Sequence, residues 1–455
     1  MPASSLNESK AMLTHEQNQR LTQTHAGTPM GNLFRAYWIP VLLSRELADP
    51  EGAPVRVRVL GEDLLAFRDT DGLVGLIAPR CPHRGADLYF GRNENHGIRC
   101  VYHGWKFDRH GHCVDMPTHD PDTYCRIKDR ARITSYPVKE WGDMVWAYLG
   151  TGAPPPLPEM EFARVPTTHR FVSKKLQECN WAQAAEGGID TAHFSFLHQP
   201  VASTEADWVQ QAARATRGYS PQTMNHQHLQ WMRDDPRPKY EVLQHGAGLV
   251  LGGSRHAGDG QRYWRMAQYL MPAHGYTPSS TPGQNFLGQT WIPIDDHSCW
   301  IYVYAWNPDR HLDAAELEQY ASGGAVFSEV DASFKPLRHR GNEYLMDRQR
   351  QKHENFTGIV GVSEQDAAIQ DSQGLIADRT REMLSSTDLG VVRFRHLMLE
   401  AAEQVAQGRS PLGRDDPMAY NVRAGAQVAP EGLGLSEVMQ LRFGHPLGYV
   451  DHSND

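Results

Sequence analysis

The chain is poor in three features that define other classes of protein. Only 6 of its 455 residues are cysteine, and Cys113, Cys125, Cys179 and Cys299 lack the regular spacing of a disulfide framework. Sparse, unpaired cysteine is typical of a reducing compartment. Basic residues are not in excess, since 45 Lys and Arg against 54 Asp and Glu give a net charge of -9. This balance argues against nucleic acid as the main partner.

Long apolar runs and nucleotide motifs are also lacking. No uninterrupted apolar stretch reaches the roughly 20 residues of a membrane-spanning helix, and Met1 to Lys10 lacks the apolar centre of a signal peptide. We therefore expect a cytoplasmic protein that does not bind membranes. The sequence has no H-E-x-x-H motif, which makes a zinc hydrolase improbable, and no glycine-rich nucleotide fingerprint.

Two short Cys/His loops are the most informative motif that is present. The first contains Cys81 and His83, the second contains Cys100 and His103, and each is closed by a glycine that favours a tight turn. Two thiolates can hold one iron and two imidazoles the other iron of a 2Fe-2S cluster. A structural zinc site uses the same ligands. Zinc sites usually pair Cys with Cys and His with His, however, so the pattern favours the cluster.

The length of the chain allows two or three domains. Short apolar runs at 55–66 and 73–77, separated by turn sequences, predict antiparallel hairpins that carry the Cys/His loops at their tips. Three consecutive prolines, Pro154 to Pro156, predict a domain boundary near residue 155. The predicted division is an N-terminal segment packing on the rest over 1–45, a cluster domain over 46–155 and a catalytic domain over 156–455.

The predicted catalytic domain contains the pattern D-x2-H-x4-H at Asp190, His193 and His198. On a helix, Asp190 and His193 share a face, but the two histidines lie about 140° apart. Both imidazoles reach one metal only if the helix widens or ends between them, and Pro200 favours an end. The alternative is a pair of histidines that are merely hydrogen-bonded near a helix end. The electron-transfer cluster upstream favours a metal site.

Two histidines and one carboxylate form the mononuclear non-haem Fe(II) site that activates O2. A helix predicted to begin at Ser363 carries Asp366 in its first turn, where it could instead complete a capping box with Ser363. The residues alone leave Asp366 open against Glu364, Asp371 and Asp378.

The loops and the D-x2-H-x4-H segment together resemble the oxygenase (alpha) component of Rieske non-haem iron ring-hydroxylating oxygenases. Residues 28–40 and 355–379 resemble the phthalate 4,5-dioxygenase branch, and the likeness covers nearly the whole chain. It implies an α+β fold, in which an N-terminal all-β Rieske domain precedes a helix-grip (START-like) antiparallel-sheet catalytic domain. The implied ligands are Cys81, His83, Cys100 and His103 for the 2Fe-2S cluster, and His193, His198 and Asp366 for the mononuclear Fe(II).

The resemblance also implies an activity and an assembly. Asp190 would bridge His193 of one subunit to a cluster histidine of the next, in a homotrimer or hexamer. A separate NAD(P)H-dependent reductase with flavin and 2Fe-2S would supply electrons, and O2 would be the co-substrate. The expected reaction is cis-dihydroxylation of an aromatic carboxylate of the phthalate, isophthalate, halobenzoate or phenoxybenzoate kind. Alternatives are a Rieske monooxygenase that performs O-demethylation or aryl-ether cleavage and, more remotely, an electron carrier without oxygenase activity.

Candidates for the substrate pocket are weaker. The stretches 236–255 and 263–272 are predicted to be strands of the pocket sheet. Arg255 is the candidate clamp for a substrate carboxylate, in bidentate geometry, and the alternative is an exposed strand arginine. Arg265 is expected to be a packed or paired core residue. His226 and His228 are expected on a solvated strand face.

Overall fold

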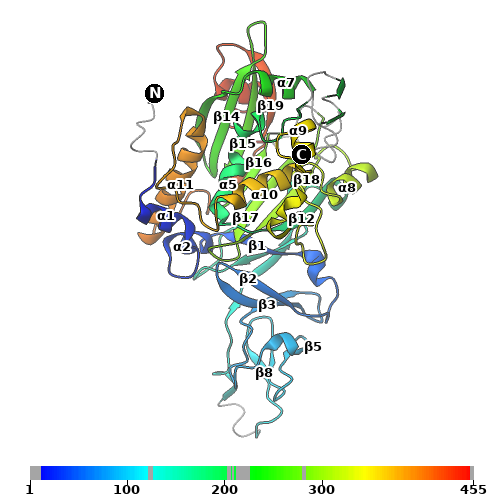
Figure 1. Cartoon of the computed structure of the whole chain (residues 1–455). Coiled ribbons are helices and arrows are strands. Elements are labelled where there is room, and N and C mark those ends of the chain that lie inside the picture. The colour runs from blue at the N-terminus through cyan, green and yellow to red at the C-terminus, as the bar shows by residue number, and fades with distance from the viewer. Residues whose placement is uncertain are drawn as a thin grey trace.

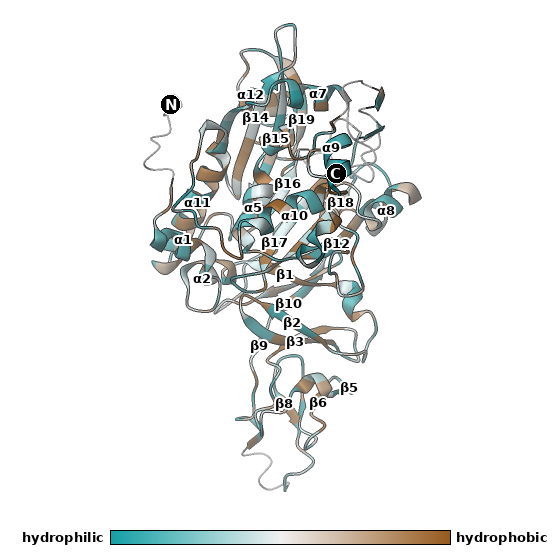
Figure 2. Ribbon diagram, viewed as in Figure 1, coloured by the Kyte–Doolittle hydropathy of each residue, from teal (hydrophilic) through white to brown (hydrophobic). Residues whose placement is uncertain are grey.

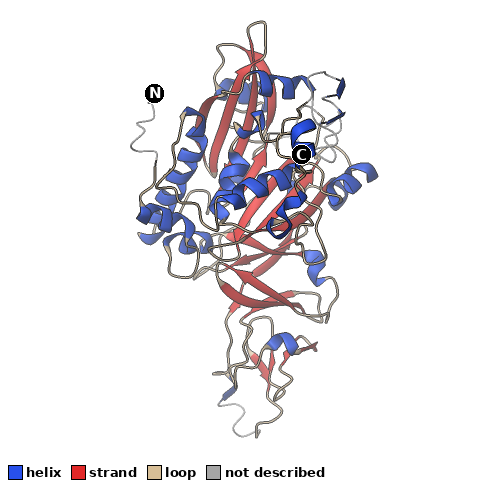
Figure 3. Cartoon of the chain, viewed as in Figure 1, coloured by secondary structure: helices blue, strands red, loops and turns tan. Residues whose placement is uncertain are grey.

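A computed structural model describes residues 12–120, 127–201, 206–207, 210–211, 226–278 and 283–450. The molecule is elongated, with a small β-rich unit at one end of a larger body that mixes helices and a sheet (Figures 1 and 3). Among the helices of these residues, none has the length and apolar composition needed to cross a bilayer.

The small unit consists of two four-stranded antiparallel sheets. Residues alternate in β3 (Glu62–Arg68), where Leu65 and Phe67 join the core that contains both loop cysteines, while Leu64 and Ala66 face the main core. The hairpins predicted over 55–66 and 73–77 are thus present. The sheets are β2 (Val55–Val59), β3, β4 (Val74–Ile77) and β9 (Ser135–Tyr136), and β5 (Arg92–Glu94), β6 (Gly97–Arg99), β7 (Lys106–Phe107) and β8 (Cys113–Asp115).

A three-stranded sheet joins the N-terminal segment to the chain before the prolines. Its order is β1 (Trp38–Leu43), β11 (Met144–Tyr148), β10 (Val138–Trp141), and every residue of β1 and β11 is buried. The indole N–H of Trp38 donates to the carbonyl of Pro155 at 2.7 Å. The division of the chain at residues 45 and 155 stays a prediction.

The larger body contains an eight-stranded antiparallel sheet that begins with β12 and ends with β13. The strands expected over 236–255 and 263–272 are confirmed as β13, β14 and β15, and β19 pairs with one half of β15 while β16 pairs with the other. The order is β12 (Arg170–Gln177), β18 (Cys299–Trp306), β17 (Phe286–Pro293), β16 (His274–Thr277), β15 (Gln261–Leu270), β14 (Gly248–His256) and β13 (Lys239–His245), with β19 (Gly425–Pro430) off this path.

Three helices form the layer beside this sheet, and one of them, α10, carries Asp366. Helix α5 (Trp181–Ile189) packs on β15, β16 and β17, α10 (Val362–Ser372) packs on α5, and α11 (Leu389–Ala406) packs on β13 and α5. Gly188 permits the close approach of α5, because a Cβ there would lie 2.1 Å from Cζ2 of Trp291. With the all-β unit before it, this sheet and its helices confirm the expected α+β fold.

The remaining helices lie at the periphery. Apolar segments concentrate on the sheet, whereas α1 and α9 are largely hydrophilic (Figure 2). The α-helices are α1 (His15–Thr22), α2 (Pro29–Arg35), α4 (Glu161–Arg164), α7 (His226–Asp234), α8 (Ala314–Ala321), α9 (Arg348–His353) and α12 (Leu435–Phe443), and the 3-10 helices are η2 (Ser44–Leu47), η3 (Leu88–Phe90), η4 (Thr167–His169), η5 (His193–Ser195), η6 (Arg340–Leu345), η7 (Ser386–Asp388) and η8 (Pro417–Tyr420).

A buried ionic network ties α5 to α11. The carboxylate of Glu186 accepts from Arg379 at 2.9 and 3.0 Å and from Arg395 at 2.7 Å, and Arg395 also binds Glu382 at 2.6 and 3.0 Å. Burial raises the pKa of Glu186, but the two guanidinium groups outweigh it and lower the pKa overall. Because each charge has a partner, the network can lie inside the protein.

We expect Glu186→Ala to lower the free energy of unfolding by about 3–5 kcal/mol, because it leaves two buried arginines without their shared carboxylate. Thermal unfolding followed by circular dichroism would measure the loss. The matched control is Glu403→Ala, which removes an exposed partner of Arg20 and should leave the melting temperature unchanged. Equal melting temperatures for both variants would contradict the prediction.

Candidate functional site

The two Cys/His loops have the same backbone design. The carbonyl of Cys81 accepts from the N–H of Gly85 at 2.9 Å, and the carbonyl of Cys100 accepts from the N–H of Gly104 at 2.9 Å. Both glycines have positive φ, 71° and 77°, which side chains other than glycine rarely tolerate. The expected tight turns are therefore present.

The donor atoms of the loops fit an iron–sulfur cluster. The rings of His83 and His103 lie 4.3 Å apart, and Trp105 stacks on His83 at 4.6 Å. Nδ1 of His83 and the indole N–H of Trp105 are buried and have no hydrogen-bond partner in the described parts of the chain. Burial raises the pKa of the Cys81 thiol to about 11, and the neighbouring Cys100 adds to the rise. Thiols in such a place ionise only when a bound cation compensates the charge, as cluster iron does.

The structure brings together His193, His198 and Asp366 from two distant segments. Nε2 of His193 lies 3.1 Å from Nε2 of His198, and Oδ1 of Asp366 lies 3.5 Å and 3.2 Å from these two nitrogens. One ligand atom from each residue lies within 4.8 Å of the others. Burial raises the pKa of Asp366, but His198 and then His193 outweigh it and keep the group a carboxylate.

The other carboxylates considered from the sequence lie elsewhere. Glu364 is buried, and burial raises the pKa of its carboxyl group. The positive charge of Lys175 offsets only part of that rise. Asp371 accepts from Gln177 at 2.8 Å, and Asp378 accepts from the hydroxyl of Thr380 at 2.6 Å. Of the four candidates, Asp366 is therefore the one beside both histidines.

The local structure differs from the predicted helices. Helix α5 ends at Ile189, so Asp190 is its C-cap, and His193 begins the 3-10 helix η5. Asp190 and His193 thus do not share a helical face, and the helix ends before both histidines instead of between them. Helix α10 has Gly361 as N-cap, with no side-chain cap, so the alternative of a capping box between Ser363 and Asp366 is wrong.

Both histidines direct Nε2 toward the centre because acceptors hold the other ring nitrogen. Nδ1 of His193 lies 3.0 Å from Oδ2 of Asp190, and Nδ1 of His198 lies 2.7 Å from Oε1 of Gln365. Two Nε2 atoms only 3.1 Å apart are stable when a proton or a metal cation lies between them. Two ligands at right angles, each about 2.1 Å from one ion, would be about 3 Å apart. The donor set therefore fits a divalent metal.

Asp190 is held by several donors. Its Oδ1 accepts from the N–H of Ala192 at 2.8 Å and from the hydroxyl of Tyr240 at 3.1 Å, and its Oδ2 also accepts from the N–H of His193 at 3.2 Å. Burial raises the pKa of Asp190, but the His193 ring and the backbone N–H groups of Ala192 and His193 outweigh it and lower the pKa overall. The side chain remains 24% exposed. Sequence reasoning did not identify Tyr240 or Gln365, because neither belongs to a spaced motif.

Two buried arginines lie beside the histidine segment. Arg255 is 0% exposed, so the alternative of a surface strand arginine is wrong. Its Nη2 donates to the carbonyl of Thr191 at 2.7 Å, while its Nε and Nη1 are buried without a partner in the described residues. Burial and then the charge of Arg265 lower the pKa of Arg255 to about 10. Arg265 donates to the Thr191 hydroxyl at 3.0 Å and lies 4.2 Å from the Phe194 ring.

The segment expected to be a solvated strand is a helix. Residues His226–Asp234 form α7, where Leu229 and Met232 are buried in a cluster with Phe194. His228 stacks on Tyr263 at 4.5 Å, and burial and Arg265 lower its pKa to about 4. The prediction of a polar strand face there is wrong.

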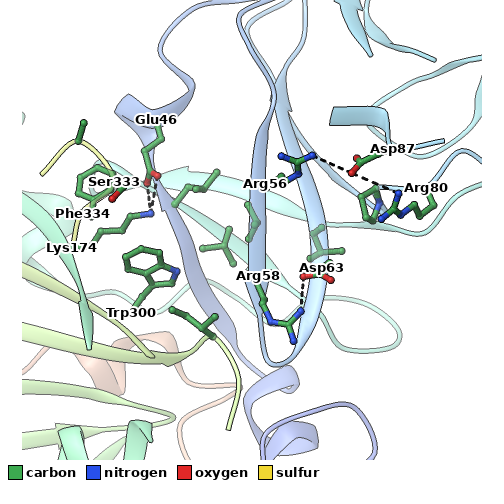
Figure 4. Close-up of a pocket in the computed structure, with 17 residues that line it drawn as sticks. Glu46, Arg56, Arg58, Asp63, Arg80, Asp87, Lys174, Trp300, Ser333 and Phe334 are labelled. Atoms are coloured by element: carbon green, nitrogen blue, oxygen red, sulfur yellow. Dashed lines mark hydrogen bonds and ion pairs between the residues drawn. The ribbon is translucent and has the colours of Figure 1, made fainter. Parts of the chain in front are cut away.

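A cavity of about 520 Å³ lies where the small unit meets the main body, away from the histidine site (Figure 4). Its basic side chains are already paired: Lys174 with Glu46 at 2.6 Å, Arg58 with Asp63 at 2.7 Å, and both Arg56 and Arg80 with Asp87. Because each of these basic side chains already has a carboxylate partner, this cavity offers no donor set comparable to the histidine site.

Known proteins share this architecture. A family model described as "Rieske [2Fe-2S] domain" matches residues 37–137, and one described as "LigXa C-terminal domain like" matches residues 147–430. The chain is 36% identical to the 3-chlorobenzoate-3,4-dioxygenase oxygenase subunit of Comamonas testosteroni, over 95% of this chain and 99% of the relative. It is also 36% identical to the phthalate 4,5-dioxygenase oxygenase subunit of Pseudomonas putida, over 88% and 89%. The solved structure of NdmB from Pseudomonas putida CBB5 matches with a TM-score of 0.55 and 20% identity, over 85% of this chain and 95% of that one.

The chain therefore belongs to the Rieske non-haem iron ring-hydroxylating oxygenases, as an oxygenase component. Within that family it lies in the phthalate 4,5-dioxygenase-like branch. The match to the Rieske domain identifies the small unit as a 2Fe-2S domain, which answers the alternative of a structural zinc site.

We expect Cys81→Ser to remove the visible absorption of the 2Fe-2S cluster, because a buried hydroxyl is a poor ligand for iron. Iron analysis should show a fall from about three iron atoms per chain to about one, the remaining atom being at His193, His198 and Asp366. A variant that keeps the wild-type spectrum would remove Cys81 from the ligand set.

Proposed function

We propose that the chain is the terminal oxygenase that uses O2 and electrons from a separate NAD(P)H-dependent reductase to hydroxylate an aromatic carboxylate. The observation that carries the proposal is the convergence of two bare imidazole nitrogens and one carboxylate in a chain that also has a Rieske domain. Fe(II) held by His193, His198 and Asp366 would supply open coordination positions for O2 beside the substrate.

The chain's own side chains prepare this site before any metal enters. Asp190 and Gln365 hold the Nδ1 protons of the two histidines, so that both Nε2 lone pairs face the centre. Asp366 stays ionised beside them. The result is a set of two neutral ligands and one anionic ligand on one side of the ion.

Arg255 and Arg265 support a carboxylate-bearing substrate. They lie on the same face of β14 and β15, since Gly253 pairs with Arg265 and Arg255 follows two residues later. Both contact Thr191, two residues before His193, and neither forms an ion pair with a carboxylate in the described residues. A substrate carboxylate would supply the missing anion. Relatives whose names specify a chlorobenzoate and a phthalate are consistent with this class.

We further propose that the electron path crosses between subunits of a homotrimer or hexamer. The Cys/His loops lie in the small unit at one end of the molecule, far from α5 and α10 (Figure 1). Apolar side chains are exposed in both regions, namely Val101 and Tyr102 near the loops and Phe196 and Phe356 near the triad. Burial of such surfaces between subunits would bring a cluster histidine of one copy to Asp190 of the next.

The electron donor proposed for this site is a separate cytoplasmic protein that carries flavin and a 2Fe-2S centre. The test of the whole proposal is oxygen uptake with a surrogate reductase and a panel of phthalate, isophthalate, halobenzoate, phenoxybenzoate and methoxybenzoate. Identification of a cis-dihydrodiol supports dioxygenation, whereas an O-demethylated product supports the monooxygenase alternative. Absence of coupled oxygen uptake with every aromatic would count against the proposal.

We expect Arg255→Ala to raise the KM for an aromatic carboxylate at least tenfold, because one charge-assisted bidentate contact stabilises binding by about 1.5–3 kcal/mol. The cluster spectrum should stay intact. Steady-state kinetics would test this, with Arg262→Ala as the control, since Arg262 is buried in the same sheet but lies on its opposite face. Equal KM values for Arg255→Ala and the wild type would remove Arg255 from the pocket.

We expect Asp190→Asn to keep both metal centres but to slow electron transfer from the reduced cluster to the mononuclear iron by at least tenfold. The amide loses the negative charge that holds the Nδ1 proton of His193. Single-turnover stopped-flow measurement of cluster oxidation would show the change, and the exposed Asp378→Asn variant is the control. A wild-type rate in Asp190→Asn would refute the bridging role.

A further inference from the structure

We infer that Gln365 is a positioning residue for His198: its amide fixes which ring nitrogen of His198 carries the proton, and so keeps Nε2 available to a metal. The inference rests on the proposed role of His198 as an iron ligand. Gln365 is the residue immediately before Asp366 and is 0% exposed, so one turn of α10 contributes both a candidate ligand and the partner of another.

The orientation of the Gln365 amide follows from its neighbours. Its Nε2 lies 2.9 Å from the carbonyl oxygen of Ile359, and its Oε1 lies 2.7 Å from Nδ1 of His198. A backbone carbonyl accepts hydrogen bonds and cannot donate them. The NH2 group must therefore face Ile359, because a flipped amide would place two oxygens against each other. This leaves the oxygen of Gln365 facing His198.

The proton position on His198 follows in turn. An amide oxygen only accepts, so Nδ1 of His198 must carry the hydrogen of this bond. The lone pair of the neutral ring is then on Nε2, which lies 3.2 Å from Oδ1 of Asp366 and 3.1 Å from Nε2 of His193. Gln365 thus selects the tautomer that a metal requires.

The surrounding fold holds the acceptor of Gln365 in place. Asn355 organises the turn before α10, because its Oδ1 accepts from the N–H of Gly358 at 2.6 Å and its Nδ2 donates to the Ile359 carbonyl at 3.3 Å. The first turn of α10 is anchored separately, since the buried Lys175 ammonium donates to the carbonyl of Ser363 at 3.1 Å. Buried hydrogen bonds therefore fix both the Ile359 carbonyl, which accepts from Gln365, and the helical turn that carries Gln365.

The two histidines consequently have chemically different partners. Asp190 is a carboxylate and is partly exposed, whereas Gln365 is a neutral amide and is fully buried. A carboxylate raises the basicity of the imidazole to which it is bonded, while an amide oxygen orients the ring without adding charge. The pair therefore combines one histidine that has a charged partner with one that has a neutral partner.

The test is metal affinity in variants whose cluster is intact. After removal of the mononuclear iron with a chelator, Gln365→Leu should bind Fe(II), and Co(II) as a spectroscopic probe, 10- to 100-fold more weakly than the wild type. Gln365→Glu keeps an acceptor for Nδ1 of His198 but loses the donor to the Ile359 carbonyl, so it should recover only part of the affinity. The matched control is Gln370→Leu, a buried glutamine of the same helix whose side chain forms no hydrogen bond with His193, His198 or Asp366.

The experiment distinguishes a failure of this inference from a failure of the proposed function. If the wild type fails to bind one Fe(II) that His198→Ala abolishes, the proposed metal site itself is wrong. If the wild type binds and Gln365→Leu binds with equal affinity and an identical Co(II) spectrum, the role of Gln365 is overturned. A general loss of structure in Gln365→Leu would appear in the cluster spectrum and the melting temperature. Gln365→Glu then decides, because it keeps the Nδ1 acceptor and should bind Co(II) more tightly than Gln365→Leu; equally weak binding would overturn the role of Gln365.

Discussion

The hydrogen bonds at Nδ1 of His193 and His198 are the constraint on which the site depends. Without them either ring could turn its protonated nitrogen toward the centre, and the two Nε2 lone pairs would not converge at 3.1 Å. The acceptors come from different elements, Asp190 from the end of α5 and Gln365 from α10. The packing of these two helices on one another therefore determines the chemistry that the site can perform.

The position of Asp190 depends in turn on the ionic network of Glu186. Glu186 lies four residues before Asp190, and the backbone N–H of Asp190 donates to its carbonyl at 3.1 Å. Arg379 and Arg395 fix the Glu186 carboxylate, and with it the last turn of α5. A buried network of this kind adds little stability relative to a well-packed apolar core, but removal of one partner leaves uncompensated buried charges. Helix α5 thus positions both the buried ionic network and Asp190, which accepts the hydrogen bond from the His193 ring.

Contacts between residues close together in the sequence can be predicted from it, whereas contacts between residues far apart in the sequence cannot. Cys81 and His83 share one tight turn, so their pattern alone predicted a ligand pair. His198 and Gln365 are 167 positions apart, and a hydrogen bond between an amide and an imidazole has no spacing signature. Asp366 was preferred over its neighbours only through family resemblance. His228 was misplaced because its polar neighbours hid the helical spacing of Leu229 and Met232, whose burial decides the local structure.

Because the two sites lie far apart within one chain, the exposed apolar side chains near each site are candidates for a contact between subunits. Val101 and Tyr102, in the second Cys/His loop, are 60% and 53% exposed. Under the proposed assembly they would pack against the surface around Phe196, and the same contact would bring the cluster near Asp190. Association and electron transfer would then depend on the same interface, so a substitution that weakens the oligomer would also slow the reduction of the iron.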